Sequence, residues 1–228
     1  MKMGETNLLK EKVRFGMKIL GIGLNYIDHA KEMGRPLPEH PFVFAKASSS
    51  VIGDCEPIIL PQLTKFVDYE VELAVIIGSS AKNVKNEDAF DYIRGFTIAN
   101  DVTARDIYIN DPRSLFIAKS FDTFCPLGPR IVIKDDLSDP YSLNISLRVN
   151  GETRQASNTQ NLIFKIPDLI SWISQRMTLE SNDVILTGTP AGVGFARKPP
   201  VPLKEGDLIE AGIEGIGILR NPVVAENA

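Results

Sequence analysis

Short runs of β-branched and other apolar residues, separated by Gly, Pro, Asn or Asp, dominate the hydrophobic pattern of this chain. Runs of this length and composition are typical of β-strands. The spacing of the runs favours a β-rich sandwich or roll over alternating β-α-β units. The pattern predicts strands at residues 17–23, 41–46, 56–61, 69–78, 95–101, 129–133, 142–151, 183–188, 207–213 and 215–220.

Three segments are predicted to be helical: residues 25–33, 86–93 and 167–177. The first begins at Asn25, a residue type that caps helices, and the third begins with a proline, which is common in a first turn. We therefore expect a mainly β fold of the α+β class with a few short helices. No shift in composition marks a domain boundary, so the sequence predicts a single domain over residues 17–228, preceded by an N-terminal extension of residues 1–16.

The composition excludes several classes of protein. The 228 residues are 43% hydrophobic and 24% charged, which is typical of a globular domain rather than a disordered chain or a coiled coil. The net charge of −4 argues against a nucleic-acid-binding protein, and no apolar run approaches the ~20 residues of a membrane-spanning helix. Two cysteines and two histidines are too few for a disulfide framework or a histidine-rich metal cluster. The polar N-terminus lacks the apolar centre of a secretory signal, so we expect a reduced, cytoplasmic protein.

Two glutamates interrupt the most regular apolar alternation of the chain, at residues 67–77. In a strand, the odd-numbered residues of this segment form one apolar face, while Glu70 and Glu72 project together from the other face. Asp101 ends the predicted strand 95–101 and would approach both glutamates if the two strands lie side by side. Three carboxylates without a nearby Cys or His suit Mg²⁺ or Mn²⁺, with Ca²⁺ as a further candidate. A solvated strand face explains the spacing alone equally well, because Glu-Val-Glu is common in strands.

Seven segments of the chain, in order, resemble those of the fumarylacetoacetate hydrolase family, over about residues 17–222. They are GIGLNYIDHAKEMG, PFVFAKASSSVIG, VDYEVELAVIIG, GFTIANDVTARD, AKSFDTFCPLGP, LTGTPAGVG and IEGIGILRNP. The chain is similar to the short, single-domain members that act on acylpyruvates and oxaloacetate. The resemblance implies a mixed β-sandwich roll, a homodimer and a divalent metal ion held by Glu70, Glu72 and Asp101.

His29 and Glu32 are three residues apart and would lie on one face of the predicted helix 25–33. A carboxylate beside an imidazole fixes the orientation of the ring, as a water-activating base requires. Spacing alone favours an ordinary surface pair. The segment GLNYIDHAKEMG, however, resembles the family's helix that closes over the metal and carries a catalytic His-Glu dyad. The resemblance therefore implies a catalytic role for both residues.

Three further residues are candidates for binding a substrate. Lys119 lies in a small and apolar setting, where a desolvated ammonium could bind a substrate carboxylate or stabilise an enolate oxygen. The match of KSFDTFCPLGP to the family supports this catalytic role. Arg105 suits carboxylate recognition, but a local pair with Asp106 is an equal alternative. Residues 187–194 predict a tight turn whose backbone N–H groups and Thr189 hydroxyl line an anion-binding pocket.

These features predict a divalent-metal-dependent enzyme. The resemblance implies a small 2-keto or 2,4-diketo acid substrate and an enolate that the metal ion stabilises. The reaction would be hydrolytic cleavage of the C3–C4 bond of an acylpyruvate or fumarylpyruvate, or decarboxylation or tautomerisation of oxaloacetate. The alternatives are a 2-hydroxyhepta-2,4-diene-1,7-dioate isomerase of aromatic catabolism and a non-enzymatic metal- or dicarboxylate-binding protein. Retention of the three carboxylates, His29, Glu32 and Lys119 argues against the last alternative.

Overall fold

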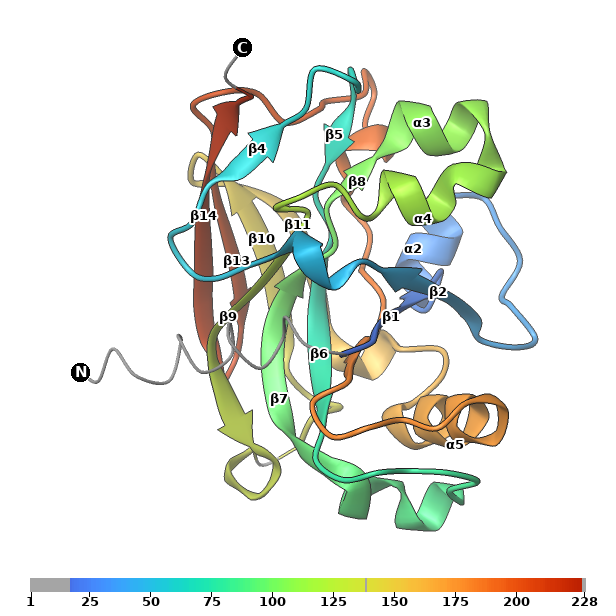
Figure 1. Cartoon of the computed structure of the whole chain (residues 1–228). Coiled ribbons are helices and arrows are strands. Elements are labelled where there is room, and N and C mark those ends of the chain that lie inside the picture. The colour runs from blue at the N-terminus through green and yellow to red at the C-terminus, as the bar shows by residue number, and fades with distance from the viewer. Residues whose placement is uncertain (1–16, 138, 227–228) are drawn as a thin grey trace.

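The computed structural model of the chain describes residues 17–137 and 139–226. The N-terminal extension predicted for residues 1–16 lies outside the described residues. Two curved β-sheets pack against each other, and the α-helices gather on one side of the molecule (Figure 1). The predicted fold class, mainly β with a few short helices, is confirmed.

The first sheet has seven strands, and the candidate site lies at the ends of two of them, β6 and β7. Strands β1 and β12 are parallel, as are β3 and β9, whereas the other neighbours in this sheet are antiparallel. The strands lie in the order β2 (Phe42–Lys46), β1 (Ile19–Gly23), β12 (Val184–Leu186), β6 (Val71–Ile77), β7 (Ile93–Asn100), β9 (Cys125–Ile133) and β3 (Val51–Ile52).

The second sheet has five strands and covers one face of the first. Its strands lie in the order β11 (Glu152–Asn158), β10 (Asn144–Val149), β13 (Leu208–Ile213), β14 (Gly217–Ala225) and β4 (Ile58–Leu60). A separate antiparallel pair consists of β5 (Val67–Asp68) and β8 (Thr103–Ala104). Strand β5 lies just before Glu70 in the chain, and β8 lies just after Asp101.

The described residues form four short α-helices: α2 (Ile27–Glu32), α3 (Arg105–Asn110), α4 (Leu115–Ala118) and α5 (Ile166–Arg176). Helices α2, α3 and α4 lie near the start of β6, whereas α5 lies toward its other end (Figure 1). Among the described residues, none of these helices is long and apolar enough to cross a membrane. Short 3₁₀ turns occupy Ser48–Ser50, Asn86–Tyr92, Pro112–Ser114, Lys134–Asp136, Thr159–Asn161 and Gly194–Ala196.

Most predicted elements are present, but several regions differ from the prediction. Helix α2 begins at Ile27 rather than at Asn25, and the two-residue strands β3 and β8 were not predicted. The segment 86–93 forms a 3₁₀ turn instead of an α-helix, and Ile93 already belongs to β7. Strand β11 was not predicted, because its sequence, ETRQASN, is polar and lacks the apolar alternation of a buried strand. Helices α3 and α4 were also not predicted. They span six and four residues, too few for a helical repeat to show in the sequence.

Strand β6 is buried on both faces. Val71, Leu73, Val75 and Ile77 belong to the larger hydrophobic core of the molecule, as the alternation in the sequence predicted. Ala74 and Ile76 belong to a second, smaller core with residues of β1, β7, β9 and β12. Glu72 shares the face of Ala74 and Ile76, so the chain places its carboxylate beside apolar surface rather than in water.

Candidate active site

Three carboxylates meet where β6 begins and β7 ends. The register pairs Val71 with Asn100, and the backbone N–H of Asp101 donates to the carbonyl of Glu70 at 2.8 Å. The carboxylates of Glu70, Glu72 and Asp101 each offer an oxygen, and these oxygens lie within 4.8 Å of one another. All three residues are buried. The predicted approach of Asp101 to the two glutamates is therefore observed.

Two buried lysines neutralise part of this negative charge. Lys119 Nζ donates to Glu70 Oε2 at 2.6 Å and also to Asp101 Oδ2. Lys46 Nζ donates to the other oxygen of Asp101 at 2.7 Å and to the carbonyl of Val102 at 3.2 Å. Burial lowers the pKa of Lys119, but Asp101 and Glu70 more than offset this effect, so its pKa is raised and the ammonium stays charged.

Arg105 is the third cation beside the cluster. The alternative prediction, a local pair of Arg105 with Asp106, is wrong. Its Nε donates to Asp68 Oδ2 at 2.9 Å, and its Nη2 donates to Glu70 Oε1. Asp106 instead accepts hydrogen bonds from the Thr64 hydroxyl and from the backbone N–H of Lys65. Arg105 therefore holds a protein carboxylate, and direct contact with a substrate stays a prediction.

The two glutamates differ in their electrostatic environment. Burial raises the pKa of Glu70, but Arg105 and Lys119 outweigh burial and hold it well below its usual range. Burial also raises the pKa of Glu72, and here the negative charges of Asp101 and Glu70 raise it further. The backbone N–H of Gly188 donates to Glu72 Oε2 at 2.6 Å, but no Lys or Arg in the described part of the chain forms an ion pair with Glu72. The carboxylate cluster thus retains negative charge that a cation can compensate.

The donor set fits a hard divalent ion. Carboxylate oxygens are the ligands that Mg²⁺, Mn²⁺ and Ca²⁺ prefer, and three of them converge here. Burial and then the negative charges of Asp101 and Glu70 raise the pKa of Glu72, and a divalent ion would relieve the repulsion among the three carboxylates. The geometry of three carboxylates does not distinguish among these ions, so the identity of the metal stays a prediction.

His29 and Glu32 form the expected pair on α2. His29 Nδ1 lies 2.9 Å from Glu32 Oε2, and His29 is 7% exposed whereas Glu32 is exposed. The catalytic role of the pair stays a prediction. Because a carboxylate can only accept, the neutral imidazole carries its proton on Nδ1 and leaves Nε2 basic. A protonated His29 would lower the pKa of Glu70, but less than Arg105 and Lys119 do.

The glycine loop 187–194 connects these parts of the site. The backbone N–H of Gly192 donates to Glu32 Oε1 at 2.8 Å, just as that of Gly188 donates to Glu72. Both glycines have a positive φ, 102° and 109° for Gly188 and Gly192. A Cβ at Gly192 would lie 2.1 Å from the carbonyl of Arg154, so only glycine fits there.

Thr189 is held by the protein itself. Its hydroxyl donates to the carbonyl of Val71 at 3.0 Å and accepts from Gln155 Nε2 at 2.8 Å. The loop therefore directs three of its N–H groups, at Gly188, Gly192 and Gly194, toward the protein's own carboxylates. Thr189 lies beside the site as expected, and its contact with a substrate stays a prediction.

Lys46 and Gln155 are the partners that the sequence interpretation missed. Lys46 lies in the segment PFVFAKASSSVIG, so the family resemblance marked its neighbourhood without giving it a role. Gln155 lies on the polar strand β11, and its Oε1 accepts from the backbone N–H of Val71 at 3.0 Å. No local pattern in the sequence connects either residue with the cluster, because both contacts depend on the packing of distant strands.

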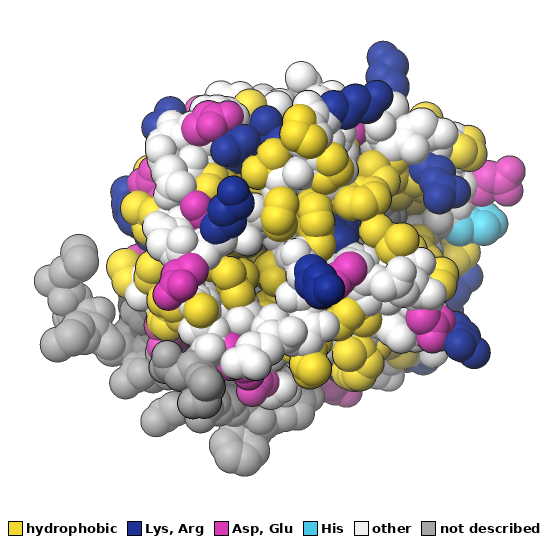
Figure 2. Space-filling view, turned by 90° about the horizontal axis from the view of Figure 1, so that it is seen from above, with side chains coloured by type: hydrophobic (Ala, Val, Ile, Leu, Met, Phe, Trp, Pro, Cys, Tyr) yellow, Lys and Arg dark blue, Asp and Glu magenta, His cyan; other side chains and the backbone are white. Residues whose placement is uncertain are grey.

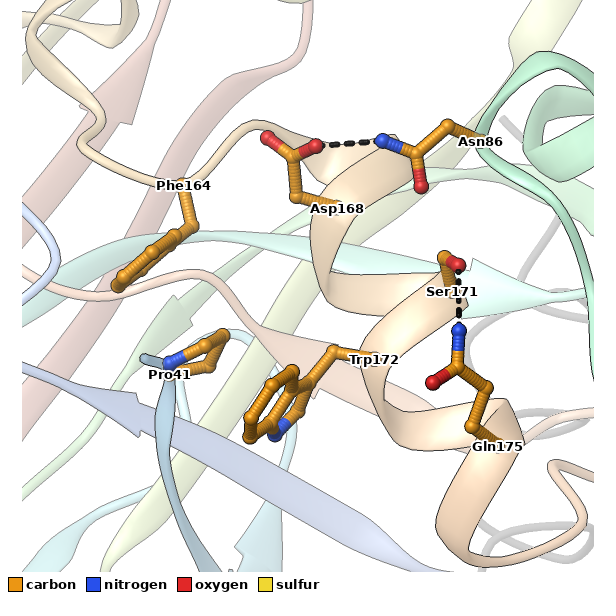
Figure 3. A pocket seen from close by; sticks show the side chains of 7 residues that line it. All are labelled: Pro41, Asn86, Phe164, Asp168, Ser171, Trp172 and Gln175. Carbon is orange, nitrogen blue, oxygen red and sulfur yellow. Dashed lines mark hydrogen bonds between the residues drawn. The ribbon is translucent and has the colours of Figure 1, made fainter. Parts of the chain in front are cut away.

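A cavity of about 250 Å³ lies apart from these residues, along α5. Phe164, Pro41 and Trp172 form its apolar side (Figure 3). Its polar side chains pair with one another: Asn86 with Asp168 at 2.6 Å, and Gln175 with Ser171 at 3.3 Å (Figure 3). This cavity contains none of the predicted catalytic or metal-binding residues.

A family model described as the C-terminal domain of fumarylacetoacetate (FAA) hydrolase matches residues 18–224. The chain belongs to the fumarylacetoacetate hydrolase family. Among curated members of this family, the mitochondrial oxaloacetate tautomerase Fahd2a of Rattus norvegicus is 50% identical over 207 residues, which are 91% of this chain and 66% of the relative. An uncharacterized protein of Methanocaldococcus jannaschii is 54% identical over 225 residues, which are 99% of this chain and 90% of the relative.

Solved structures of other family members share the fold. A 2-hydroxyhepta-2,4-diene-1,7-dioate isomerase from Mycobacterium marinum matches with a TM-score of 0.82 and 40% identity, over 93% of this chain and 76% of that one. A maleylpyruvate hydrolase from Sphingobium, solved with manganese and pyruvate, matches with a TM-score of 0.78 and 34% identity, over 92% and 71%. The family thus includes tautomerases, isomerases and hydrolases, which supports an enzymatic role for this chain. The rat relative is named as mitochondrial, and a cytoplasmic location for this chain stays a prediction.

Proposed function

We propose that this chain is a divalent-metal-dependent enzyme that interconverts the keto and enol forms of oxaloacetate. The observation that carries the proposal is the buried cluster of Glu70, Glu72 and Asp101, with Lys119 bonded to two of its members. The half-identical relative that is named an oxaloacetate tautomerase supports this choice of reaction. The chain spans about two thirds of that relative, so the activity is assigned by proposal.

The metal ion would be held by Glu70, Glu72 and Asp101. When bound, such an ion supplies Lewis-acid stabilisation of negative charge on a substrate oxygen. Lys119 is a buried, charged ammonium beside the same carboxylates, so it can also stabilise an enolate oxygen or a substrate carboxylate. Arg105 forms an ion pair with Glu70 and Lys46 forms one with Asp101, so both cations hold these carboxylates in place.

His29 is assigned the proton transfer at C3. Conversion of the keto form to the enol removes a proton from C3 and adds one to the oxygen at C2, and the reverse reaction returns the proton to C3. The basic Nε2 of His29 can accept and return the C3 proton, while Glu32 keeps the opposite ring nitrogen protonated. The hydrogen bond from Gly192 to Glu32 fixes the carboxylate that orients the ring.

The same groups suit cleavage of a C3–C4 bond, which is the wider reaction class that the sequence suggested. Hydrolysis of an acylpyruvate needs a water activated by His29, and decarboxylation of oxaloacetate needs none, but both produce an enolate of pyruvate. The maleylpyruvate hydrolase structure with manganese and pyruvate supports this class. The isomerase of Mycobacterium marinum supports the second candidate, isomerisation of 2-hydroxyhepta-2,4-diene-1,7-dioate.

Parallel coupled assays test the proposal and separate these reactions. Enol oxaloacetate is added with Mg²⁺ or Mn²⁺, and malate dehydrogenase reports the keto form while lactate dehydrogenase reports pyruvate. We expect faster formation of the keto form with little pyruvate. The Glu72→Ala variant, purified in the same way, is the control for catalysis by free metal. Enol decay equal to that of the control would contradict the proposal. Pyruvate from oxaloacetate or an acylpyruvate would indicate C–C cleavage, and turnover of the diene-dioate would indicate the isomerase.

A homodimer and a single catalytic domain over residues 17–228 are parts of the same proposal. Apolar side chains gather on the face that carries α3 and α4 (Figure 2), and Ile109, Phe116 and Ile117 are each about half exposed. We propose that a second copy of the chain covers this surface, because apolar side chains that gather on one face mark interaction sites. Sedimentation showing only a 25.1 kDa species would contradict the dimer.

A further inference from the structure

Asp68, at the end of β5, is a fully buried carboxylate that receives four hydrogen bonds. Its Oδ1 accepts from the backbone N–H groups of Gly194 at 2.7 Å and Tyr69 at 2.9 Å. Its Oδ2 accepts from the backbone N–H of Phe195 at 3.1 Å and from Arg105 Nε at 2.9 Å. Neither the sequence nor the proposed reaction assigns a role to this residue.

The position of Asp68 connects the glycine loop with the metal cluster. Arg105 donates to Asp68 with one nitrogen and to Glu70 with another, so the two carboxylates share one guanidinium. At Gly194, a Cβ would lie 2.7 Å from Asp68 Oδ1, so this close approach depends on glycine. The loop is therefore tied to Glu72 near its start, at Gly188, and to Asp68 at its end.

The buried charges show why a second carboxylate on Arg105 matters. Without Asp68, the three carboxylates of the cluster would face three buried cations: Lys46, Lys119 and Arg105. With Asp68, the same cations face four carboxylates, so one negative charge is uncompensated when all four carboxylates are ionised, as they would be around a bound cation. That charge attracts a divalent ion, because charges in a buried site are only weakly screened.

We propose that Asp68 is a positioning residue that, through Arg105, sets the orientation and net charge at Glu70 and couples it to the loop 188–194. This inference rests on the proposed metal site. It does not depend on which keto acid is the substrate.

Titration with Mn²⁺ tests whether the charge of Asp68 affects the affinity of the carboxylate cluster for a cation. Asp68→Asn keeps the shape of the side chain but removes its charge, and we expect the dissociation constant for Mn²⁺ to rise about tenfold, as for other outer partners of metal ligands. Asp183→Asn is the matched control. Asp183 is also fully buried, accepts from the backbone N–H groups of Lys18 and Glu180, and pairs with the Lys18 ammonium at 2.6 Å. We expect both variants to lose stability but only Asp68→Asn to lose Mn²⁺ affinity. Equal Mn²⁺ affinity in the two variants would overturn the inference.

A double-mutant cycle tests whether Asp68 acts through Arg105. In an Arg105→Met background, we expect Asp68→Asn to cause no further loss of Mn²⁺ affinity, because the connecting guanidinium is absent. Independent, additive losses from the two substitutions would overturn the coupling.

Hydrogen exchange in metal-free protein gives a readout that needs neither metal nor substrate. We expect Arg105→Met to speed exchange several-fold at the amides of Gly194 and Phe195, because Asp68 then loses the cation that holds it. Unchanged exchange would overturn the inference. This measurement also decides it if Asp68→Asn does not fold. A wild-type chain that binds no Mn²⁺ would refute the proposed metal site, while the exchange experiment still decides the coupling.

Discussion

The two faces of strand β6 are equally buried, yet they contribute differently to the protein. On one face, Val71, Leu73, Val75 and Ile77 pack in the larger core and hold the two sheets together. On the other face, Glu72 precedes Ala74 and Ile76, and its carboxylate belongs to the acidic cluster. The apolar face lowers the free energy of the folded state, whereas burying carboxylates raises it unless cations compensate. One strand therefore stabilises the fold with one face and carries the chemistry on the other, so substitutions should separate the two.

The largest effect is expected from loss of the metal. EDTA should remove nearly all activity and Mg²⁺ or Mn²⁺ should restore it, since Glu70, Glu72 and Asp101 are proposed to hold the ion. Glu72→Ala should cause the same loss while its circular dichroism spectrum stays that of the wild type. Full activity in protein shown by elemental analysis to be metal-free would contradict the distinction between the two faces of β6, because the acidic face would then have no metal to hold.

The proton-transfer step is expected to show the next largest effect. His29→Gln should lower kcat by a factor of about 10²–10⁴, the usual contribution of a positioned acid-base group. Binding of Mn²⁺ should not change, because His29 is not one of the three carboxylates. Glu32→Gln should lower kcat less, since the amide oxygen can still accept from Gly192. If His29→Gln retains the wild-type kcat, the His-Glu pair has only a structural role.

Substitutions on the apolar face of β6 should lower the stability of the fold without changing metal binding. Leu73→Ala removes a fully buried side chain from the larger core, so the free energy of unfolding should fall by about 2–5 kcal/mol in chemical denaturation. The affinity of the folded protein for Mn²⁺ should stay that of the wild type. A loss of Mn²⁺ affinity as large as in Glu72→Ala would show that the two faces cannot be separated.

Local periodicity explains which parts of this site could be predicted from the sequence. The alternation in residues 67–77 placed Glu70 and Glu72 on one face, and the three-residue spacing in helix α2 joined His29 with Glu32. Both predictions depend only on the geometry of a single element. The position of Asp101 needed one further assumption, that two strands neighbouring in sequence also pair.

The partners that were missed come from far along the chain. Lys46 is 55 residues from Asp101, and Gln155 is 84 residues from Val71, so each contact depends on how the sheets assemble. Arg105 shows the same limit: the neighbouring Asp106 was an equally good partner in the sequence, but the fold gives it Asp68 and Glu70 instead. Sequence patterns predicted which carboxylates converge, whereas their pairing with the cations that compensate them required the structure.

The smallest effect concerns the access of solvent to the core behind the acidic face of β6. Cys125 belongs to the smaller core with Ala74 and Ile76, and burial raises the pKa of its thiol to about 12. The other cysteine, Cys55, is exposed, although burial and then Asp54 raise the pKa of its thiol as well. At mildly alkaline pH, iodoacetamide should therefore label Cys55 slowly and leave Cys125 unreacted until denaturant is added, because the thiolate is the reactive form. Mass spectrometry of peptides measures both rates in one sample. Labelling of Cys125 as fast as Cys55 in the folded protein would mean that the core behind Glu72 opens to solvent, and the carboxylate cluster would then lose the burial on which its affinity for a cation depends.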